Sequence, residues 1–247
     1  MLYSERAYRL RHQQEDLVHF RVVVKETDLD IAVKKERFSA GVAEAAKRAV
    51  EECRKPLEEY VRQDPEFLRA LTPYKVRDDA PPIIKEMARA AEAAGVGPMA
   101  AVAGAIAEYV GRILLRYSRD VIIENGGDIY LRTGKIRRIG IFAGKSPFSY
   151  RLALEVKPEW GPLGVCTSSG TVGHSLSFGK ADAVVVVSPS AALADAVATA
   201  AGNLVQTGAD VQAAVEFALS IPGVKGAVAI KDELLAARGY VKLVPSR

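Results

Sequence analysis

A narrow polar stripe runs through an otherwise apolar stretch around residue 195. Between Asp182 and Asp210 the only charged residue is Asp195, in a run dominated by Ala, Val and Leu. If this stretch is helical, Asp195, Thr199 and Asn203 lie on one face, because side chains four residues apart stack above one another. A carboxylate and a hydroxyl so placed suit Mg²⁺, which prefers oxygen ligands. A solvated stripe or a helix-capping network would give the same pattern, and both interpretations stay open.

Two loops could hold a phosphorylated ligand. The first runs through Asn125, Gly126, Gly127 and Asp128. Its paired glycines permit positive φ angles and let a ligand approach the backbone closely. Asn-Gly is also the commonest hairpin signal, so a plain turn explains the segment equally well.

The second loop collects hydroxyls, glycines and a histidine within nine residues, after a predicted strand. It contains Cys166, Thr167, Ser168, Ser169, Gly170, Thr171, Val172, Gly173 and His174. Such a loop can direct amides and hydroxyls at phosphate oxygens, with His174 as a further donor or a general base. A polar surface loop is the alternative. A Cys or Ser nucleophile paired with His174 is a competing catalytic hypothesis, although Cys166 has the setting of a small buried core residue.

Two glycine patterns carry less weight. Residues 95–100 match a dinucleotide-binding pattern, but a helix and not a strand is expected before them, which favours a turn between helices. A phosphate-binding Walker loop is excluded, because Gly173 and Gly179 enclose five residues and Lys180 is followed by Ala181.

The elements that must position these loops follow from apolar periodicity. Alternation over residues 17–34 predicts a hairpin with a turn at Thr27 and Asp28, and residues 8–11 are a further candidate strand. The triplet at 133–135 predicts a second hairpin turn. We expect helices at 39–61, 81–95, 98–118, 190–204 and 210–219, a short one after 64–65, and strands at 121–124, 129–132, 136–142, 150–156, 164–167, 183–187 and near 228 and 241. This order predicts an α+β fold with a largely antiparallel sheet.

Composition narrows the class of protein. The chain has 247 residues, 49% hydrophobic and 26% charged, and no stretch resembles a linker, so we expect one domain over residues 1–247. The lack of a secretory signal or a long uncharged apolar span predicts a cytoplasmic protein outside the membrane. Cys53 and Cys166 form no zinc or redox motif. The net charge of +4 is dispersed, so nucleic acid is not an expected partner. Apolar Ala and Val surfaces could pack between subunits as a homo-oligomer.

Taken together, the segments at about residues 98–205 resemble the ApbE-like superfamily, best known for FAD-dependent, Mg²⁺-requiring FMN transferases that modify protein hydroxyls. Residues 120–128 look like the family's strand and Gly-Gly-Asp turn, and residues 164–169 look like its Gly-Val-Ala-Thr-Ser segment. Residues 188–199 are similar to its Pro-Ser-Ala-x-x-Ala-Asp-Ala-x-x-Thr helix, and residues 104–107 to its Gly-x-Ile-Ala stretch.

The resemblance implies a T-fold-like domain and a specific site. The cation ligands would be the Ala107 carbonyl, Asp195 and Thr199. The flavin nucleotide, FAD or FMN, would contact the turn at 125–128 and the loop at 167–170, with His174 near the pyrophosphate. Asp195 would hold Mg²⁺ or activate the acceptor hydroxyl.

Three departures from the family pattern bear on activity. Glu108 stands where the family has Lys, which removes a cation from the pyrophosphate site. His174 leads into Ser175 and not into the family's Asp-Pro-x-Thr-Gly element, and no exported-lipoprotein signal is present. We therefore consider nucleotidyl or FMN transfer with Mg²⁺, a non-catalytic module that binds a flavin or phosphorylated ligand, and, more weakly, a Cys/His hydrolase.

Overall fold

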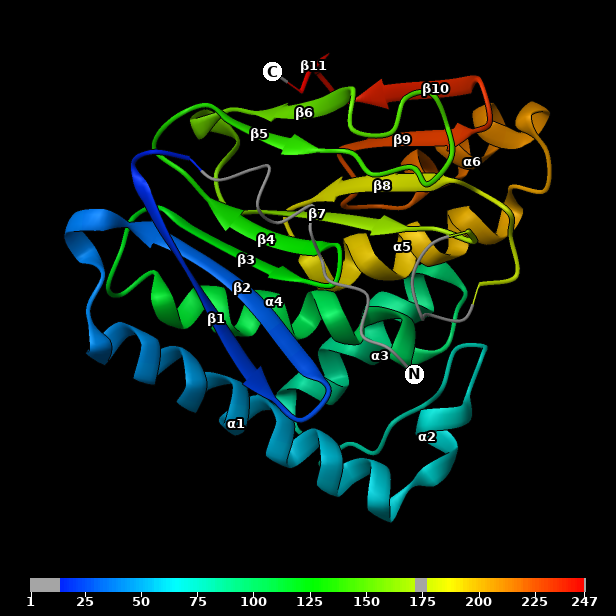
Figure 1. Ribbon diagram of the computed structural model, residues 1–247. Coiled ribbons are helices and arrows are strands. Elements are labelled where there is room, and N and C mark those ends of the chain that lie inside the picture. The colour runs from blue at the N-terminus through cyan, green and yellow to red at the C-terminus, as the bar shows by residue number, and fades with distance from the viewer. Residues whose placement is uncertain (1–13, 172–176, 247) are drawn as a thin grey trace.

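The main sheet of the protein is continuous and antiparallel throughout. We describe residues 14–171 and 177–246 of a computed structural model. Eight strands pair in an order that departs from the chain order only where β4 pairs with β7 (Figure 1). In sheet order they are β1 (Leu17–Val24), β2 (Thr27–Lys34), β3 (Val121–Asn125), β4 (Asp128–Arg132), β7 (Leu163–Ser168), β8 (Ala183–Ser188), β9 (Gly226–Lys231) and β10 (Leu234–Gly239).

Helices cover one face of this sheet, and α4 and α5 lie directly against it (Figure 1). Two of them begin at a serine that accepts a hydrogen bond from a first-turn amide: Ser39 from Val42 and Ser190 from Leu193. The helices are α1 (Ala40–Gln63), α2 (Pro65–Arg69), α3 (Pro82–Ala94), α4 (Val102–Leu114), α5 (Ala191–Leu204) and α6 (Val211–Ser220).

A three-stranded sheet covers the opposite face. Its strands are β11 (Leu243–Pro245), β6 (Leu152–Val156) and β5 (Arg137–Gly140). Strand β8 shows how both faces come to be buried, because Val184 and Val186 pack among the helices while Ala183, Val185 and Val187 pack toward the small sheet. The sequence of a strand that is buried on both faces is a continuous apolar run, and the sequence of β8 has this form.

These observations confirm the predicted α+β class and most predicted elements. Two predicted turns were wrong. The β1–β2 turn lies at Lys25 and Glu26, while Thr27 and Asp28 are buried within β2 and pair with Val24 and Val23.

The segment at 133–135 does not close a hairpin. It carries the chain from β4, which pairs with β3 and β7, across to β5 in the small sheet. A tight turn can lead to a new sheet as readily as to the neighbouring strand, so the local signal did not decide the pairing. The candidate strand at 8–11 lies outside the described residues.

The glycines near residue 95 form a turn between helices, as expected from their context. Gly95 ends α3 in the left-handed region, with φ of 73°. A Cβ atom on Gly97 would lie 1.7 Å from the Ala70 carbonyl oxygen, so close packing requires glycine there. Among the described residues, no single helix is long and apolar enough to span a membrane; the α3 segment and Pro98–Leu114 pass that test only as a pair bent by 104°.

Candidate carboxylate site between the sheet and two helices

Three side chains from different elements meet where the sheet faces α5. Asp195 lies in the middle of α5, Asp128 is the first residue of β4, and Cys166 lies on β7. Tyr130 and Cys166 pack in the helix-side core, and residues two apart on a strand share a face, so Asp128 points to the helix side as well. The Cys166 thiol donates to the carbonyl of Ala191, one turn before Asp195 on α5, and the charges of Asp128 and Asp195 both raise the pKa of this thiol.

Asp195 also contacts the start of α4. Its Oδ2 atom accepts a hydrogen bond of 2.9 Å from the Gly104 amide, one of the first-turn amides that have no partner inside a helix. Gly104 permits this approach, because a Cβ atom there would lie 2.2 Å from the Ala191 carbonyl oxygen. The predicted capping network is therefore present, and it points inward.

Asp128 is held in an environment that disfavours its charge. Burial raises the pKa of Asp128 to about 7, the charge of Glu124 adds to this, and the Cys166 thiol and the Thr167 amide partly offset it. Its Oδ1 atom is shielded from solvent and has no hydrogen-bond partner among the described residues. Burial, and then the Asp128 charge, raise the pKa of Asp195 well above its ordinary value.

The charge of Asp128 acts on buried Asp195, and a shared proton or a bound cation would relieve the repulsion between the two carboxylates. Within the described residues, no group of three or more His, Cys, Asp and Glu side chains is arranged to hold a metal ion. Mg²⁺ needs less than that, since one or two carboxylates, waters and ligand phosphates satisfy it. The donor set therefore fits Mg²⁺, and the unpartnered Asp128 oxygen is a free ligand position.

The other predicted metal ligands have different surroundings. Thr199 is half-buried one helical turn beyond Asp195, and its hydroxyl has no partner within the described part of the chain. Ala107 is fully buried inside α4. Asp195 accepts its hydrogen bond from the Gly104 amide, one turn nearer the start of that helix. Asn203, the third member of the stripe, accepts a bond of 2.9 Å from the Phe178 amide.

The Gly-Gly turn brings β3 and β4 against the start of α4. Gly126 and Gly127 have φ angles of 71° and 120°, which favour glycine at both positions. The Asn125 side chain donates to the Ala103 carbonyl at 3.2 Å and so fixes the turn to α4. The hairpin and the ligand-approach interpretations are thus compatible, but the Asn125 amide is already bonded to the protein.

The hydroxyl loop contributes side chains to both faces of the sheet. Ser168 lies beside α5, because a Cβ atom on Gly202 would come 3.4 Å from its hydroxyl. Thr167 pairs with Val185 of the opposite core, so its amide and not its hydroxyl is directed at Asp128. The Ser169 hydroxyl donates to the Ala181 carbonyl at 3.4 Å.

The far end of this loop packs closely on the following segment. A Cβ atom on Gly170 would lie 2.0 Å from the Gly179 carbonyl oxygen, and the Gly170 amide donates to the Ala181 carbonyl at 2.9 Å. Residues 172–176, which include the predicted base His174, lie outside the described residues.

Cys166 has the environment of a core thiol. Burial, followed by the charges of Asp128 and Asp195, raises its pKa well above the ordinary value. The thiol donates to the Ala191 carbonyl at 3.3 Å. A nucleophilic cysteine must be a thiolate near neutral pH, so the hydrolase hypothesis gains no support here.

Glu108 plays a part that the sequence did not reveal. This carboxylate is 1% exposed and accepts bonds from the Ala191 amide at 2.7 Å and the Ser190 hydroxyl at 3.2 Å, which neutralises the positive end of α5. Its other oxygen pairs with Arg112. An acidic residue on an apolar helix, four positions before an arginine, was the available signal, but the partner helix lies about eighty residues away in sequence.

The antiparallel sheet with helices on one face and a small sheet on the other is the fold of the ApbE-like class. The structure resembles the apo flavinyl transferase ApbE of Pseudomonas stutzeri, with a TM-score of 0.59 and 14% identity over 90% of this chain and 94% of that one. The flavin transferase ApbE of Vibrio cholerae gives a TM-score of 0.53 and 14% identity over 90% and 96% of the two chains. At these identities the likeness establishes the fold.

Sequence comparison then gives the family. The model of the family described as AbpE bacteria matches residues 9–230, and the chain belongs to that ApbE-like family. A UPF0280 protein of Methanococcus aeolicus is 39% identical over 91% of each chain. Another, from Methanothrix thermoacetophila, is 44% identical over 80% of this chain and 84% of its own.

Proposed function

We propose that the protein binds a flavin nucleotide, FAD or FMN, or a similar phosphorylated ligand together with Mg²⁺, and that it transfers the nucleotidyl or FMN group to an acceptor hydroxyl. The pair of carboxylates Asp128 and Asp195, with an Asp128 oxygen that is shielded from solvent and unpartnered, carries this proposal. Such a pair is costly in a protein that never binds a cation there, because each charge destabilises the other.

Asp195 and Asp128 would be the carboxylate ligands of the cation. Thr199 would add a hydroxyl, and the Ala107 carbonyl is the further ligand that the family resemblance implies. When bound, Mg²⁺ would neutralise both carboxylates and the charge that develops on a transferred phosphoryl group. Asp195 also orients the start of α4 through the Gly104 amide, so the same side chain links the site to the fold.

The nucleotide would lie against the two loops. The absent side chains of Gly126 and Gly127 leave room for a ligand beside the β3–β4 turn. Ser168, on the α5 side of β7, would donate its hydroxyl to a phosphate oxygen, and the backbone at Thr167, Ser169 and Gly170 would line the ligand. His174 would be a further donor. A protein hydroxyl would be the acceptor.

Two titrations and one assay test this proposal. Mg²⁺ and FAD are titrated into the full chain by calorimetry, and AMP release is then followed with a hydroxyl-bearing acceptor peptide. We expect saturable Mg²⁺ binding, FAD binding that depends on Mg²⁺, and slow AMP release. Asp195→Asn should lower Mg²⁺ affinity at least tenfold, because one charged ligand is lost. Glu159→Gln, at an exposed carboxylate, is the matched control. Unchanged Mg²⁺ affinity in Asp195→Asn would refute the site.

A non-catalytic binding module is the second candidate. Glu108 favours it, because this carboxylate already neutralises the α5 N-terminus where the resembled family has a lysine. The same assay separates the two candidates: FAD binding with Mg²⁺ but without AMP release supports the module, while AMP release supports the transferase.

A further inference from the structure

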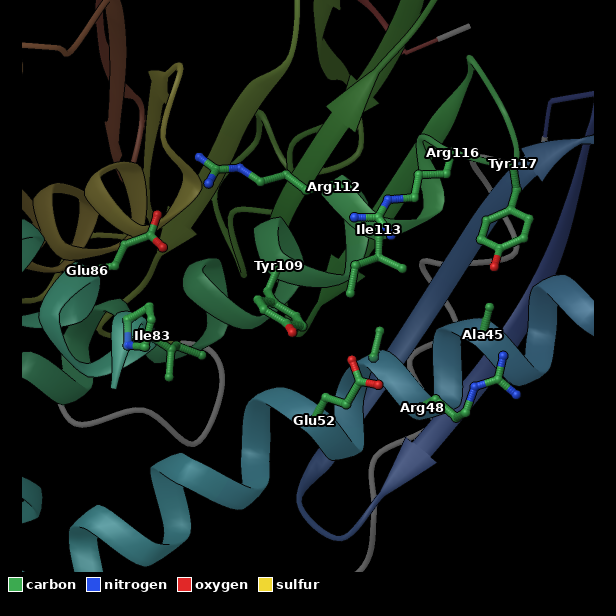
Figure 2. Close-up of a pocket in the computed structure, with 12 residues that line it drawn as sticks. Ala45, Arg48, Glu52, Ile83, Glu86, Tyr109, Arg112, Ile113, Arg116 and Tyr117 are labelled. Carbon is green, nitrogen blue, oxygen red and sulfur yellow. The ribbon is translucent and has the colours of Figure 1, made fainter. Parts of the chain in front are cut away.

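A groove separate from the carboxylate site opens between α1, α3 and α4 (Figure 2). Its volume is about 560 Å³, in the range of sites for small ligands. The α1 wall presents the small residues Ala45 and Ala49, which leave the space open. The opposite wall carries Tyr109 and Arg112 of α4 and Arg116 in the turn that follows this helix.

The charged side chains that line the groove differ in how strongly they are paired within the protein. Arg112 pairs with Glu108, and Figure 2 shows it turned toward Glu86 at one end of the groove. Burial, and then the Glu108 charge, raise the pKa of Glu86, and the charge of Arg112 opposes this. Arg48, at the other end, lies 3.9 Å from Glu44, and both side chains are more than half exposed, so this ion pair is weak.

Arg116 is the available cation of the groove. It has no acidic partner among the described residues, and Figure 2 shows its side chain folded back beside Ile113 on the groove side of α4. The rings of Tyr109 and Tyr117 are 37% and 44% exposed within the same lining. A guanidinium group forms paired hydrogen bonds to carboxylate and phosphate, and exposed tyrosine rings pack against planar groups.

We propose that this groove binds a small ligand in which an oxyanion, phosphate or carboxylate, is joined to a planar ring. Arg116, with Arg48 opposite, contacts the oxyanion. Ile113 and Tyr117, on the Arg48 side of the groove, contact the ring. Glu52, on the α1 wall, adds a negative charge to the lining of the groove. It therefore disfavours ligands with more than two negative charges.

Calorimetry on the full chain at low ionic strength, without Mg²⁺, tests the proposal with phenyl phosphate and benzoate as the two oxyanion probes. Phenol lacks the anion and inorganic phosphate lacks the ring, and each should bind at least tenfold more weakly than the better probe. The stronger of phenyl phosphate and benzoate identifies the preferred oxyanion.

Variants place the binding in the groove. Arg116→Met keeps the aliphatic stem and should weaken the better probe about tenfold, the cost of one charged hydrogen bond. Arg62→Met, on the exposed side of α1, is the control and should change nothing. Because the titrations contain no Mg²⁺, saturable probe binding that Arg116→Met weakens does not depend on the proposed cation site. Failure of both probes to saturate, or equal affinity in Arg116→Met and wild type, would overturn the proposal.

Discussion

At the residue scale, the candidate site depends on carboxylates that lie among apolar side chains. The inward placement of Asp195 could be predicted, because it is the only charge in a long apolar run. The sharing of this environment with Asp128 could not be derived from spacing, since the two residues lie on different elements and meet only through the β4–β7 pairing. The role of Glu108 was missed for the same reason. Its substitution for a family lysine looked like a lost ligand contact, and it proved to be a gained helix cap.

Asp128 should make the ligand-free protein less stable as the pH rises. The folded pKa of Asp128 is about 7, above the ordinary value of 3.8, so between these values the folded state holds a proton that the unfolded state has released. Stability is therefore lost as the pH increases from about 4 to about 7, by at most about 4 kcal/mol. Asp128→Asn should match wild type in urea unfolding at pH 4 and exceed it at pH 8. An equal difference at both pH values would show that Asp128 does not titrate in this way.

At the scale of elements, α4 and α5 cap each other. Asp195 of α5 accepts from the start of α4, and Glu108 of α4 accepts from the start of α5. The helices themselves were predictable from periodicity and from prolines and serines near their starts. Their mutual capping was not, because it depends on a close approach that Gly104 allows and that no local pattern encodes.

Glu108→Gln should lower the free energy of unfolding by about 1–3 kcal/mol, because the amide keeps a hydrogen bond but loses its charge at the α5 N-terminus and beside Arg112. Glu108→Lys, which restores the residue of the resembled family, should cost more, since a buried cation would face a positive helix end. Urea unfolding measures both. Glu51→Gln, exposed on α1, serves as the control, and a lysine variant as stable as wild type would contradict the capping role.

At the scale of the molecule, the chain builds two cores against one sheet. The α+β class followed from the order of elements, and the continuous valines of β8 are explained by burial on both faces. The transfer of β5 to the small sheet was not predictable, because strand pairing is a long-range property. Buried Arg137, at the start of β5 in the small sheet, forms ion pairs with Asp16 and Asp120, which directly precede strands β1 and β3 of the main sheet.

Arg137→Met should destabilise the fold by about 3 kcal/mol, because removing one member of a buried ion pair leaves Asp120 with the more distant Lys34, at 3.5 Å, as its cationic partner. Burial opposes the charge of Asp120, and the Gly134 amide, Thr133 and Arg137 outweigh it and keep the pKa of Asp120 below its ordinary value. The penalty should therefore shrink at acidic pH, where Asp120 can take up a proton. Thermal unfolding at pH 4.5 and pH 7.5 measures the loss of stability, with Arg138→Met, at an exposed position, as the control. Equal stability of the two variants at both pH values would argue against a stabilising role of the Arg137 ion pairs.

The reciprocal bonds between α4 and α5 have a consequence for how the site comes into being. Residues 104 and 195, and residues 108 and 191, are separated by 91 and 83 positions in the chain. The entropy of closing such long loops must be met before either contact stabilises anything. Each helix start is capped by a residue of the other helix, so we expect the carboxylate site to assemble late and as a unit, and a fragment carrying only one half of the chain would not contain it.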